Sequence, residues 1–279
     1  MPEAAARHES PDVLIGTSGY DYPEWKGVFY PEDLKRADFL AYYATQFNAL
    51  ELNNTFYNMP TQARIMSFYE RSEGRLKFAI KANRLLTHEI GPAWDVVARD
   101  FRSAVVPLLE KDALASVLFQ LPESFHYTPE NRRYLAALLA AFDGFPSVVE
   151  FRHNEWIRES VFEGLEKRST GIVFCDMPQL KNLPDGSAMK TPFIGKNAYI
   201  RMHGRNAGAW YVHDSAQNGS ARYDYDYSDE EIQEFIAVIR TAEDEGKTVQ
   251  VYFNNHPKGK GARNGITLRD KLAAGGRAL

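Results

Sequence analysis

The sequence predicts a (β/α)8 barrel of the TIM type, and three observations support this fold class. Eight short segments rich in Val, Ile, Phe and Tyr recur along the 279 residues, as β-strands do. Helical patterns separate these segments, and eight β/α units match the length that such a barrel usually takes, about 250 residues. The irregular spacing of the strands argues against a solenoid of near-identical repeats. A doubly wound open sheet is the rival architecture, but it usually needs fewer strands.

Each predicted strand has a short centre rich in apolar residues, from VLI in the first to VQVYF in the last. In chain order the predicted strands are Val13–Gly16, Ala49–Asn53, Leu76–Lys81, Leu114–Gln120, Ser147–Arg152, Gly171–Asp176, Ala198–His203 and Thr248–Asn254.

Apolar periodicity and capping signals predict the helices between them. Helical spacing covers Asp33–Phe47, Thr61–Arg71 and Trp94–Lys111. In the last of these, we expect Pro107 to kink the helix or to end its first part. Thr128 followed by Pro129 predicts a cap and the first residue of another helix. Capping-box patterns at Ser160 and Ser228 begin two more.

The chain shows no linker or change in composition that would separate two halves. We therefore predict an N-terminal tail over residues 1–11 and a single barrel domain over residues 12–279. The segment Met177–Asn197 contains three prolines and two glycines, and this composition predicts a long loop.

Composition excludes several functional classes. The net charge of −4 lacks the basic bias of a dedicated duplex-DNA binder. The only cysteine, Cys175, cannot form an internal disulfide framework or a cysteine-based zinc cage. No apolar run approaches the roughly 18 residues of a membrane span, and the N-terminus lacks the apolar core of a secretory signal. These features predict a cytoplasmic protein without membrane contact.

Charged and polar residues interrupt the strand pattern at the carboxyl ends, where active sites of this fold lie. The ionisable ones are Glu51, Lys81, Glu150, Arg152, Asp176, Arg201 and His203. If they face inward, three acidic side chains balance three basic ones, and His203 adds a titratable group. A substrate pocket with acid/base groups beside anion-binding cations is the functional interpretation. A polar plug in which the charges only neutralise one another is the structural alternative.

Several runs in the sequence resemble one known family. They are IGTSGYDYPEWKGVFYP, LELNNTFYNMP, FAIKANRLLTH, LFQLPESF, VVEFRHNEW, FCDMP, YIRMHGR and VYFNNH. Over residues 12–272 the chain is similar to the YecE-like family, also called domain of unknown function 72. The resemblance implies a TIM-type barrel but no established reaction. It implies site residues at Glu51, Asn53, Lys81, Arg152, His153, Asp176, Arg201, His203 and Asn254.

The leading functional hypothesis is an enzyme that acts by acid/base chemistry on a small polar, anionic metabolite, such as a sugar phosphate or a nucleotide-like molecule. The predicted catalytic residues are Glu51, Glu150, His203 and Asp176. Among these, His203 is the preferred group for proton transfer near neutral pH. The predicted substrate-binding residues are Asn53, Lys81, Arg152, His153, Arg201, Asn254, Asn255 and Trp25.

Two alternatives remain open. The first is a divalent-metal-dependent isomerase or phosphodiester hydrolase, with ligands drawn from Glu51, Glu150, Asp176, His203 and His256. No local ligand spacing supports it and arginines stand nearby, so we predict no bound metal and no cofactor. The second is a non-catalytic module that binds a nucleotide or single-stranded nucleic acid through aromatic side chains. The acidic composition disfavours it. The oligomeric state is left open.

Overall fold

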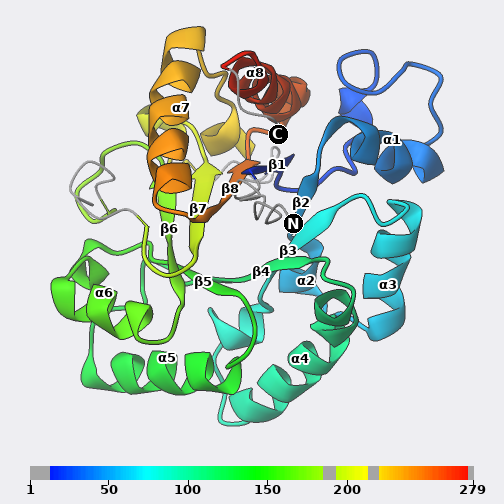
Figure 1. Ribbon diagram of the computed structural model, residues 1–279. Helices are drawn as coiled ribbons and strands as arrows, with labels where there is room; N and C mark the ends of the chain where they lie inside the picture. The colour runs from blue at the N-terminus through cyan, green and yellow to red at the C-terminus, as the bar shows by residue number, and fades with distance from the viewer. Residues whose placement is uncertain (1–12, 185–192, 213–219, 276–279) are drawn as a thin grey trace, which may run out of the picture.

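Eight parallel strands stand in the centre of the molecule and helices surround them (Figure 1). The computed structural model describes residues 13–184, 193–212 and 220–275. The sheet order is β1-β8-β7-β6-β5-β4-β3-β2, so each strand lies beside its neighbour in sequence and β8 returns to β1. The predicted TIM-type barrel is thereby confirmed. The predicted tail, residues 1–11, lies outside the described residues.

All eight predicted strands are present, with ends within two residues of the expected positions. Their bounds are β1 Val13–Thr17, β2 Ala49–Leu52, β3 Lys77–Lys81, β4 Leu114–Gln120, β5 Ser147–Glu150, β6 Gly171–Asp176, β7 Asn197–Met202 and β8 Thr248–Phe253.

Side chains take over much of the hydrogen bonding between β1 and β2, where the barrel closes. The backbone ladder is reduced to one isolated bridge, between Ser18 and Glu51. The amide of Asn48 occupies the amino-terminal part of this seam. Its oxygen accepts from the backbone N–H of Ile15 at 2.8 Å, and its nitrogen donates to the carbonyl of Val13 at 2.9 Å. One side chain thus pairs two backbone groups that a neighbouring strand would otherwise satisfy.

The Tyr43 hydroxyl fills the next position along the seam. It accepts from the backbone N–H of Thr17 at 2.8 Å and donates to the carbonyl of Ala49 at 3.0 Å. Gly16 allows the two backbones to approach this closely, because a Cβ atom there would lie 2.1 Å from the carbonyl oxygen of Ala49.

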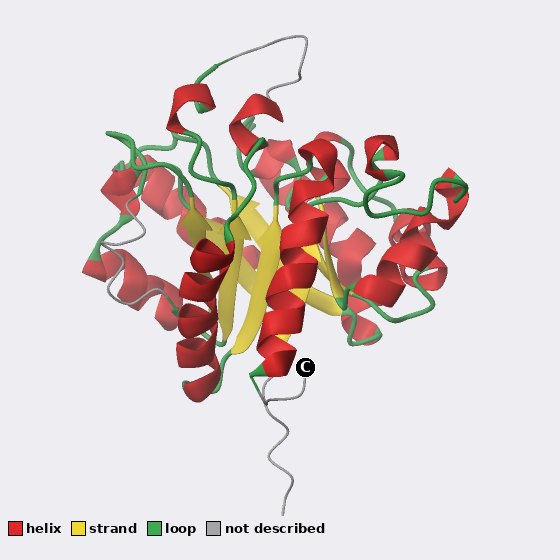
Figure 2. Cartoon of the chain, turned by 90° about the horizontal axis from the view of Figure 1, so that it is seen from above, coloured by secondary structure: helices red, strands yellow, loops and turns green. Residues whose placement is uncertain are grey.

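The helices cover the outside of the strands, and short helical turns and loops gather at the end of the barrel away from the C-terminus (Figure 2). The α-helices are α1 Phe39–Gln46, α2 Asn54–Tyr57, α3 Gln62–Arg71, α4 Trp94–Glu110, α5 Pro129–Ala141, α6 Glu159–Glu166, α7 Asp229–Asp244 and α8 Lys260–Ala274. None of the helices in the described residues is both long and apolar enough to cross a lipid bilayer.

Two of the local helix signals behave as predicted. The Thr128 side chain caps α5 by accepting from the backbone N–H of Asn131, and Pro129 follows as the first helical residue. Ser228 and Glu231 form a complete capping box at the start of α7.

Three expectations for the helices are wrong. The first helix begins at Phe39 rather than Asp33, after a 3-10 turn over Arg36–Asp38. Ser160 lies inside α6, which begins at Glu159 without a side-chain cap. Pro107 lies inside α4, which continues to Glu110, so the proline does not end the first part of this helix.

A neighbouring helix supplies the hydrogen bond that Pro107 cannot make within α4. A proline cannot donate to the carbonyl four residues earlier, here that of Ser103. The Gln62 side chain of α3 donates to that carbonyl at 2.9 Å and replaces the missing partner.

Two apolar clusters make up the core. The larger one fills the space between the strands and the helices. The smaller one lies inside the barrel and includes Leu14, Ala49, Ala79, Leu118, Val148, Val173, Tyr199 and Tyr252. Because side chains alternate along a strand, the next inward position toward the carboxyl end lies two residues further on. In β2, β3, β5 and β7 that position holds a charged residue: Glu51, Lys81, Glu150 and Arg201.

Candidate functional site at the carboxyl end of the barrel

Arg201 on β7 is the centre of the charged group inside the barrel. Its guanidinium donates to both carboxylate oxygens of Glu51, from Nε at 2.9 Å and from Nη2 at 2.6 Å. Its third nitrogen, Nη1, donates to Glu150 at 2.6 Å. The Tyr199 hydroxyl donates to Glu51 at 2.7 Å. All four side chains are buried, so the bidentate geometry and the tyrosine offset the cost of taking the charges out of water.

The arginines keep both glutamates ionised. Burial alone would raise the pKa of Glu51, but the Arg201 guanidinium outweighs it and holds that pKa below its ordinary value. Burial acts in the same way on Glu150, where Arg152 and Arg201 together hold the pKa well below its ordinary value. The two carboxylates therefore carry charge throughout the neutral range.

A second arginine joins this group to His203. Arg152 pairs with Glu150, and its Nη2 lies 3.0 Å from Nε2 of His203. Because an arginine can only donate, Nε2 is an acceptor and the imidazole proton lies on Nδ1. The side-chain nitrogen of Asn254 lies 3.1 Å from Nδ1. Because a protonated Nδ1 is itself a donor, the two groups form a hydrogen bond only with the amide turned so that its oxygen faces the ring. The Asn255 amide nitrogen donates to the His203 carbonyl at 3.0 Å.

His203 is held as a neutral imidazole. Burial, followed by the charge of Arg152, lowers its pKa to about 3. Such a group exchanges few protons near neutral pH, and its acceptor nitrogen already faces Arg152. The geometry therefore suits His203 to orienting Arg152 rather than to the acid/base role predicted from sequence.

Lys81 contributes a positive charge without an acidic partner. Its side chain is half-buried, and its Nζ lies 4.3 Å from the centre of the Phe56 ring. Among the described residues it makes no ion pair, whereas Arg152 and Arg201 are each paired. Burial, followed by the charge of Arg201, lowers the pKa of Lys81 to about 7.

Asp176 lies outside this group, so the predicted balance of three acidic and three basic side chains is wrong. Its carboxylate accepts from the Tyr227 hydroxyl at 2.6 Å and from Arg205 Nε at 3.0 Å. Arg205 in turn pairs with two glutamates of α7. The residue before it, Cys175, is the one that faces Glu150 inside the barrel. The inward group thus holds two carboxylates and three cations.

Trp25 was predicted to bind substrate, but its side chain is fully buried and cannot contact a ligand. Its indole N–H donates to the carbonyl of His256 at 2.7 Å, and its ring packs against Phe29 and Tyr30. Its role here is to anchor the segment after β1 to the segment after β8.

Asn53 lines a cavity of about 400 Å³ between the segment after β1 and helix α3. The side-chain oxygens of Asn53 and Asn54 are buried and have no hydrogen-bond partner within the part of the chain that the structure describes. Arg64 and Arg71 of α3 line the same cavity. Asn53, predicted from sequence to bind substrate, thus lines a polar cavity whose lining does not include Arg201, Glu51 or Glu150.

Arg201, Glu51, Glu150, Arg152 and His203 are joined by the contacts above and are called the Arg201 group below. His153 points away from this group. Its Nδ1 accepts from the backbone N–H of Glu155 at 3.2 Å, and its ring packs against His126 with 4.7 Å between ring centres.

The metal ligands considered from sequence do not form a suitable cation site. Within the described chain, Glu150 and His203 approach each other together with Cys175. However, Arg152 and Arg201 contact Glu150, and Arg152 also contacts His203. Two guanidinium groups at the donor atoms oppose a further cation there.

Two tyrosines in these interactions were not predicted. Tyr199 precedes Arg201 by two residues, so strand alternation would have placed it on the same inward face. Tyr227 comes from the segment before α7 and contacts Asp176 across 51 residues of sequence, a contact for which the sequence holds no local signal.

Comparisons with known proteins agree with this fold. The family model for the protein of unknown function DUF72 matches residues 14–279. A curated relative, UPF0759 protein YunF of Bacillus subtilis, is 26% identical over 270 residues, which cover 93% of this chain and 94% of the relative.

Crystal structures of two DUF72 family proteins are similar to this structure. The Thermotoga maritima protein TM1631 is 31% identical with a TM-score of 0.82, covering 94% of this chain and 99% of that one. The Enterococcus faecalis protein EF0366 is 22% identical with a TM-score of 0.81, covering 94% and 96%, and this likeness concerns the fold alone. From the match of its sequence over nearly its whole length, this chain belongs to the DUF72 family of proteins of unknown function.

Proposed function

We propose that this protein is an enzyme that binds a small anionic metabolite at the carboxyl end of the barrel and acts on it by acid/base chemistry. The observation that carries the proposal is Lys81, a half-buried amine beside the Arg201 group with no acidic partner in the described chain. An uncompensated positive charge in such a place favours an anionic ligand. The carboxyl end of the strands is also where enzymes of this fold bind their substrates.

Lys81 replaces His203 as the residue for proton transfer. With a pKa of about 7, Lys81 is present both as an ammonium, which attracts an anion, and as an amine, which accepts a proton. Glu51 and Glu150 stay ionised and hold the arginines in place. In this proposal Arg152 helps to hold the anion, and His203 and Asn254 orient Arg152.

The test begins with ligand-dependent thermal stability. The probes are inorganic phosphate, a pentose phosphate, a nucleoside monophosphate and a single-stranded oligonucleotide. A ligand at 100 times its Kd stabilises the folded state by about 2.7 kcal/mol, which for a chain of this size raises the midpoint by roughly 5 °C. We expect such a shift with one class of small anion. Binding of the oligonucleotide alone would instead support the nucleic-acid-binding alternative.

Lys81→Met is the decisive variant, and Lys77→Met is its matched control. Lys77 lies on the same strand, at the opposite end of the barrel, where it pairs with Asp112 at 2.7 Å. We expect Lys81→Met to abolish the anion-dependent shift and Lys77→Met to retain it. Equal shifts in both variants would contradict the assignment of Lys81.

Acid/base chemistry is then tested directly. The bound metabolite is incubated with the enzyme in deuterium oxide, and its carbon-bound protons are followed by NMR. We expect the wild-type protein and Lys77→Met to exchange one proton and Lys81→Met to exchange none. A ligand that binds through Lys81 without any exchange would leave a binding protein and would overturn the enzymatic part of the proposal.

A further inference from the structure

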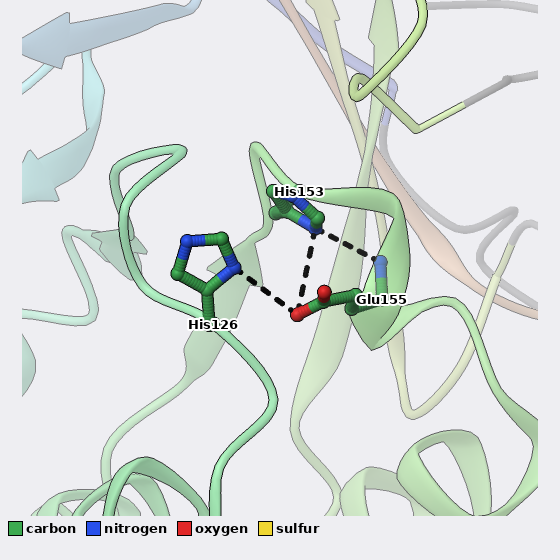
Figure 3. A group of neighbouring side chains, drawn as sticks. All are labelled: His126, His153 and Glu155. Atoms are coloured by element: carbon green, nitrogen blue, oxygen red, sulfur yellow. Dashed lines mark hydrogen bonds and ion pairs between the residues drawn. The ribbon is translucent and has the colours of Figure 1, made fainter.

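A second chemical centre lies at the ends of β4 and β5, away from the Arg201 group. His126 follows β4, and His153 and Glu155 follow β5. Figure 3 shows the two imidazole rings and the carboxylate pointing toward one another. We propose that these three residues form a binding site for a divalent transition-metal ion of the Zn²⁺ or Co²⁺ type. The site is independent of the function proposed for Lys81.

The distances between the donor atoms are close to those of such a site. Nδ1 of His126 lies 3.2 Å from Oε2 of Glu155, and Nδ1 of His153 lies 3.7 Å from the same oxygen. One donor atom from each residue lies within 4.8 Å of the other two. Bond lengths of about 2.1 Å place two ligands of a tetrahedral zinc ion about 3.4 Å apart. A small rotation of the His126 side chain, which is 53% exposed, closes the difference.

The other two ligands are held in position by the fold. The Glu155 carboxylate accepts from the backbone N–H of Tyr127 at 3.1 Å, and this bond fixes it on the side of His126. The His153 side chain is only 10% exposed, so its ring has little freedom to move. Its Nδ1 accepts from the backbone N–H of Glu155 at 3.2 Å, and metal binding exchanges this long hydrogen bond for a bond from Nδ1 to the ion.

Two neighbouring arginines, Arg158 and Arg132, are engaged with other groups than the donor atoms. Arg158 donates to the Glu155 carbonyl at 2.6 Å, and its guanidinium lies over the Tyr127 ring at 4.5 Å. Arg132 lies over the same ring at 4.8 Å. Neither forms an ion pair with the Glu155 carboxylate, in contrast to the arginines that contact Glu150. The Glu150 carboxylate is therefore already neutralised by arginines, whereas the Glu155 carboxylate pairs with neither Arg158 nor Arg132. A cation is for this reason favoured at His126, His153 and Glu155 rather than at Glu150, Cys175 and His203.

The donor set selects the class of metal. Two imidazole nitrogens and one carboxylate oxygen suit Zn²⁺, Co²⁺, Ni²⁺ or Fe²⁺, whereas Mg²⁺ and Ca²⁺ prefer oxygen ligands alone. Three protein ligands leave at least one coordination position for water or a ligand, as in catalytic rather than structural zinc sites.

The experiment measures metal binding without any substrate, so it does not depend on the Lys81 proposal. Protein prepared without a polyhistidine tag is stripped with a chelator and titrated with Co²⁺ while its visible absorption is recorded. Zn²⁺ is then added in competition. We expect one Co²⁺ per chain in the wild-type protein, displaced by Zn²⁺.

Glu155→Gln and His126→Ala test the ligands, and His88→Ala is the matched control. His88 is another exposed loop histidine, whose ring packs against Phe56 outside the group. We expect each ligand variant to lose more than about tenfold in Co²⁺ affinity, since even outer-sphere partners contribute that much. His88→Ala should bind as the wild type does. Circular dichroism confirms that each variant is folded. Absence of Co²⁺ binding, or equal affinity in all four proteins, would overturn the proposal.

Discussion

At the scale of single residues, the lowered pKa of Lys81 has a cost in stability. The folded protein holds its pKa at about 7, whereas a lysine in the unfolded chain titrates near 10.4. The unfolded chain therefore binds more protons between these values, and the charged lysine destabilises the folded state at neutral pH.

Lys81→Met should for this reason stabilise the protein. We expect the free energy of unfolding to rise on the order of 2 kcal/mol at pH 7, a value reduced because the side chain is partly exposed to solvent. Urea unfolding of Lys81→Met and Lys77→Met provides the comparison. A Lys81→Met protein that is less stable than the wild type would show that the lysine has a stabilising partner.

Arg201, unlike Lys81, stabilises the folded protein, because it pairs with two buried carboxylates. Its removal leaves Glu51 and Glu150 buried without their shared partner. We expect Arg201→Met to lower the free energy of unfolding by about 3–5 kcal/mol. The exposed pair of Arg36 with Asp21 gives the control, since solvent screens this pair and Arg36→Met should leave the stability nearly unchanged. Chemical denaturation measures both, and similar losses in the two variants would argue against a tightly paired Arg201.

At the scale of elements, the junction of β1 and β2 depends on side chains more than on the backbone ladder. The Tyr43 hydroxyl pairs one backbone group from each side. Replacement by phenylalanine removes the partner of both groups while the ring still fills its place. The barrel then keeps its strands but loses a connection where it closes.

We expect Tyr43→Phe to destabilise the protein by about 1–3 kcal/mol, the cost of leaving buried polar groups unpaired. Tyr42→Phe is the natural control, because Tyr42 is the adjacent residue and is only half-buried. Thermal unfolding of the two variants tests this. Equal midpoints would mean that the backbone bridge between Ser18 and Glu51 is sufficient to close the barrel.

At the scale of the whole molecule, the interior charges predict a loss of stability in acid. His203 has a pKa of about 3 in the folded protein and about 6.5 when unfolded. Between these values the unfolded chain binds the extra proton, so stability falls as the pH falls. Glu51 and Glu150 have lowered pKa values in the fold and act in the same direction below their ordinary values.

Urea unfolding at pH 7.5, 6, 5 and 4 measures this dependence. We expect His203 to contribute a decrease of up to about 1.4 kcal/mol per pH unit below pH 6.5. His203→Gln removes that contribution and should have a flatter profile. Parallel profiles for the two proteins would show that His203 does not remain neutral in the fold.

The sequence by itself determined the barrel and its strands. Strand order in a (β/α)8 barrel follows chain order, and alternation along each strand marks which residues face inward. Both rules need only the positions of residues along the chain, so they placed Glu51, Glu150 and Arg201 at the same end of the barrel interior. The structure brings these three side chains into contact.

Only the tertiary structure decided how the other residues pair. Asp176 ends β6, one position out of phase with the inward residues, and takes a partner from the segment before α7. Trp25 follows a strand and was therefore predicted to bind substrate, yet its side chain is buried and its indole N–H donates to the carbonyl of His256 after β8. His153 turned toward His126 because the β4 and β5 ends lie side by side. Each pairing joins distant segments, and the burial and charge that result set the pKa values of Lys81 and His203.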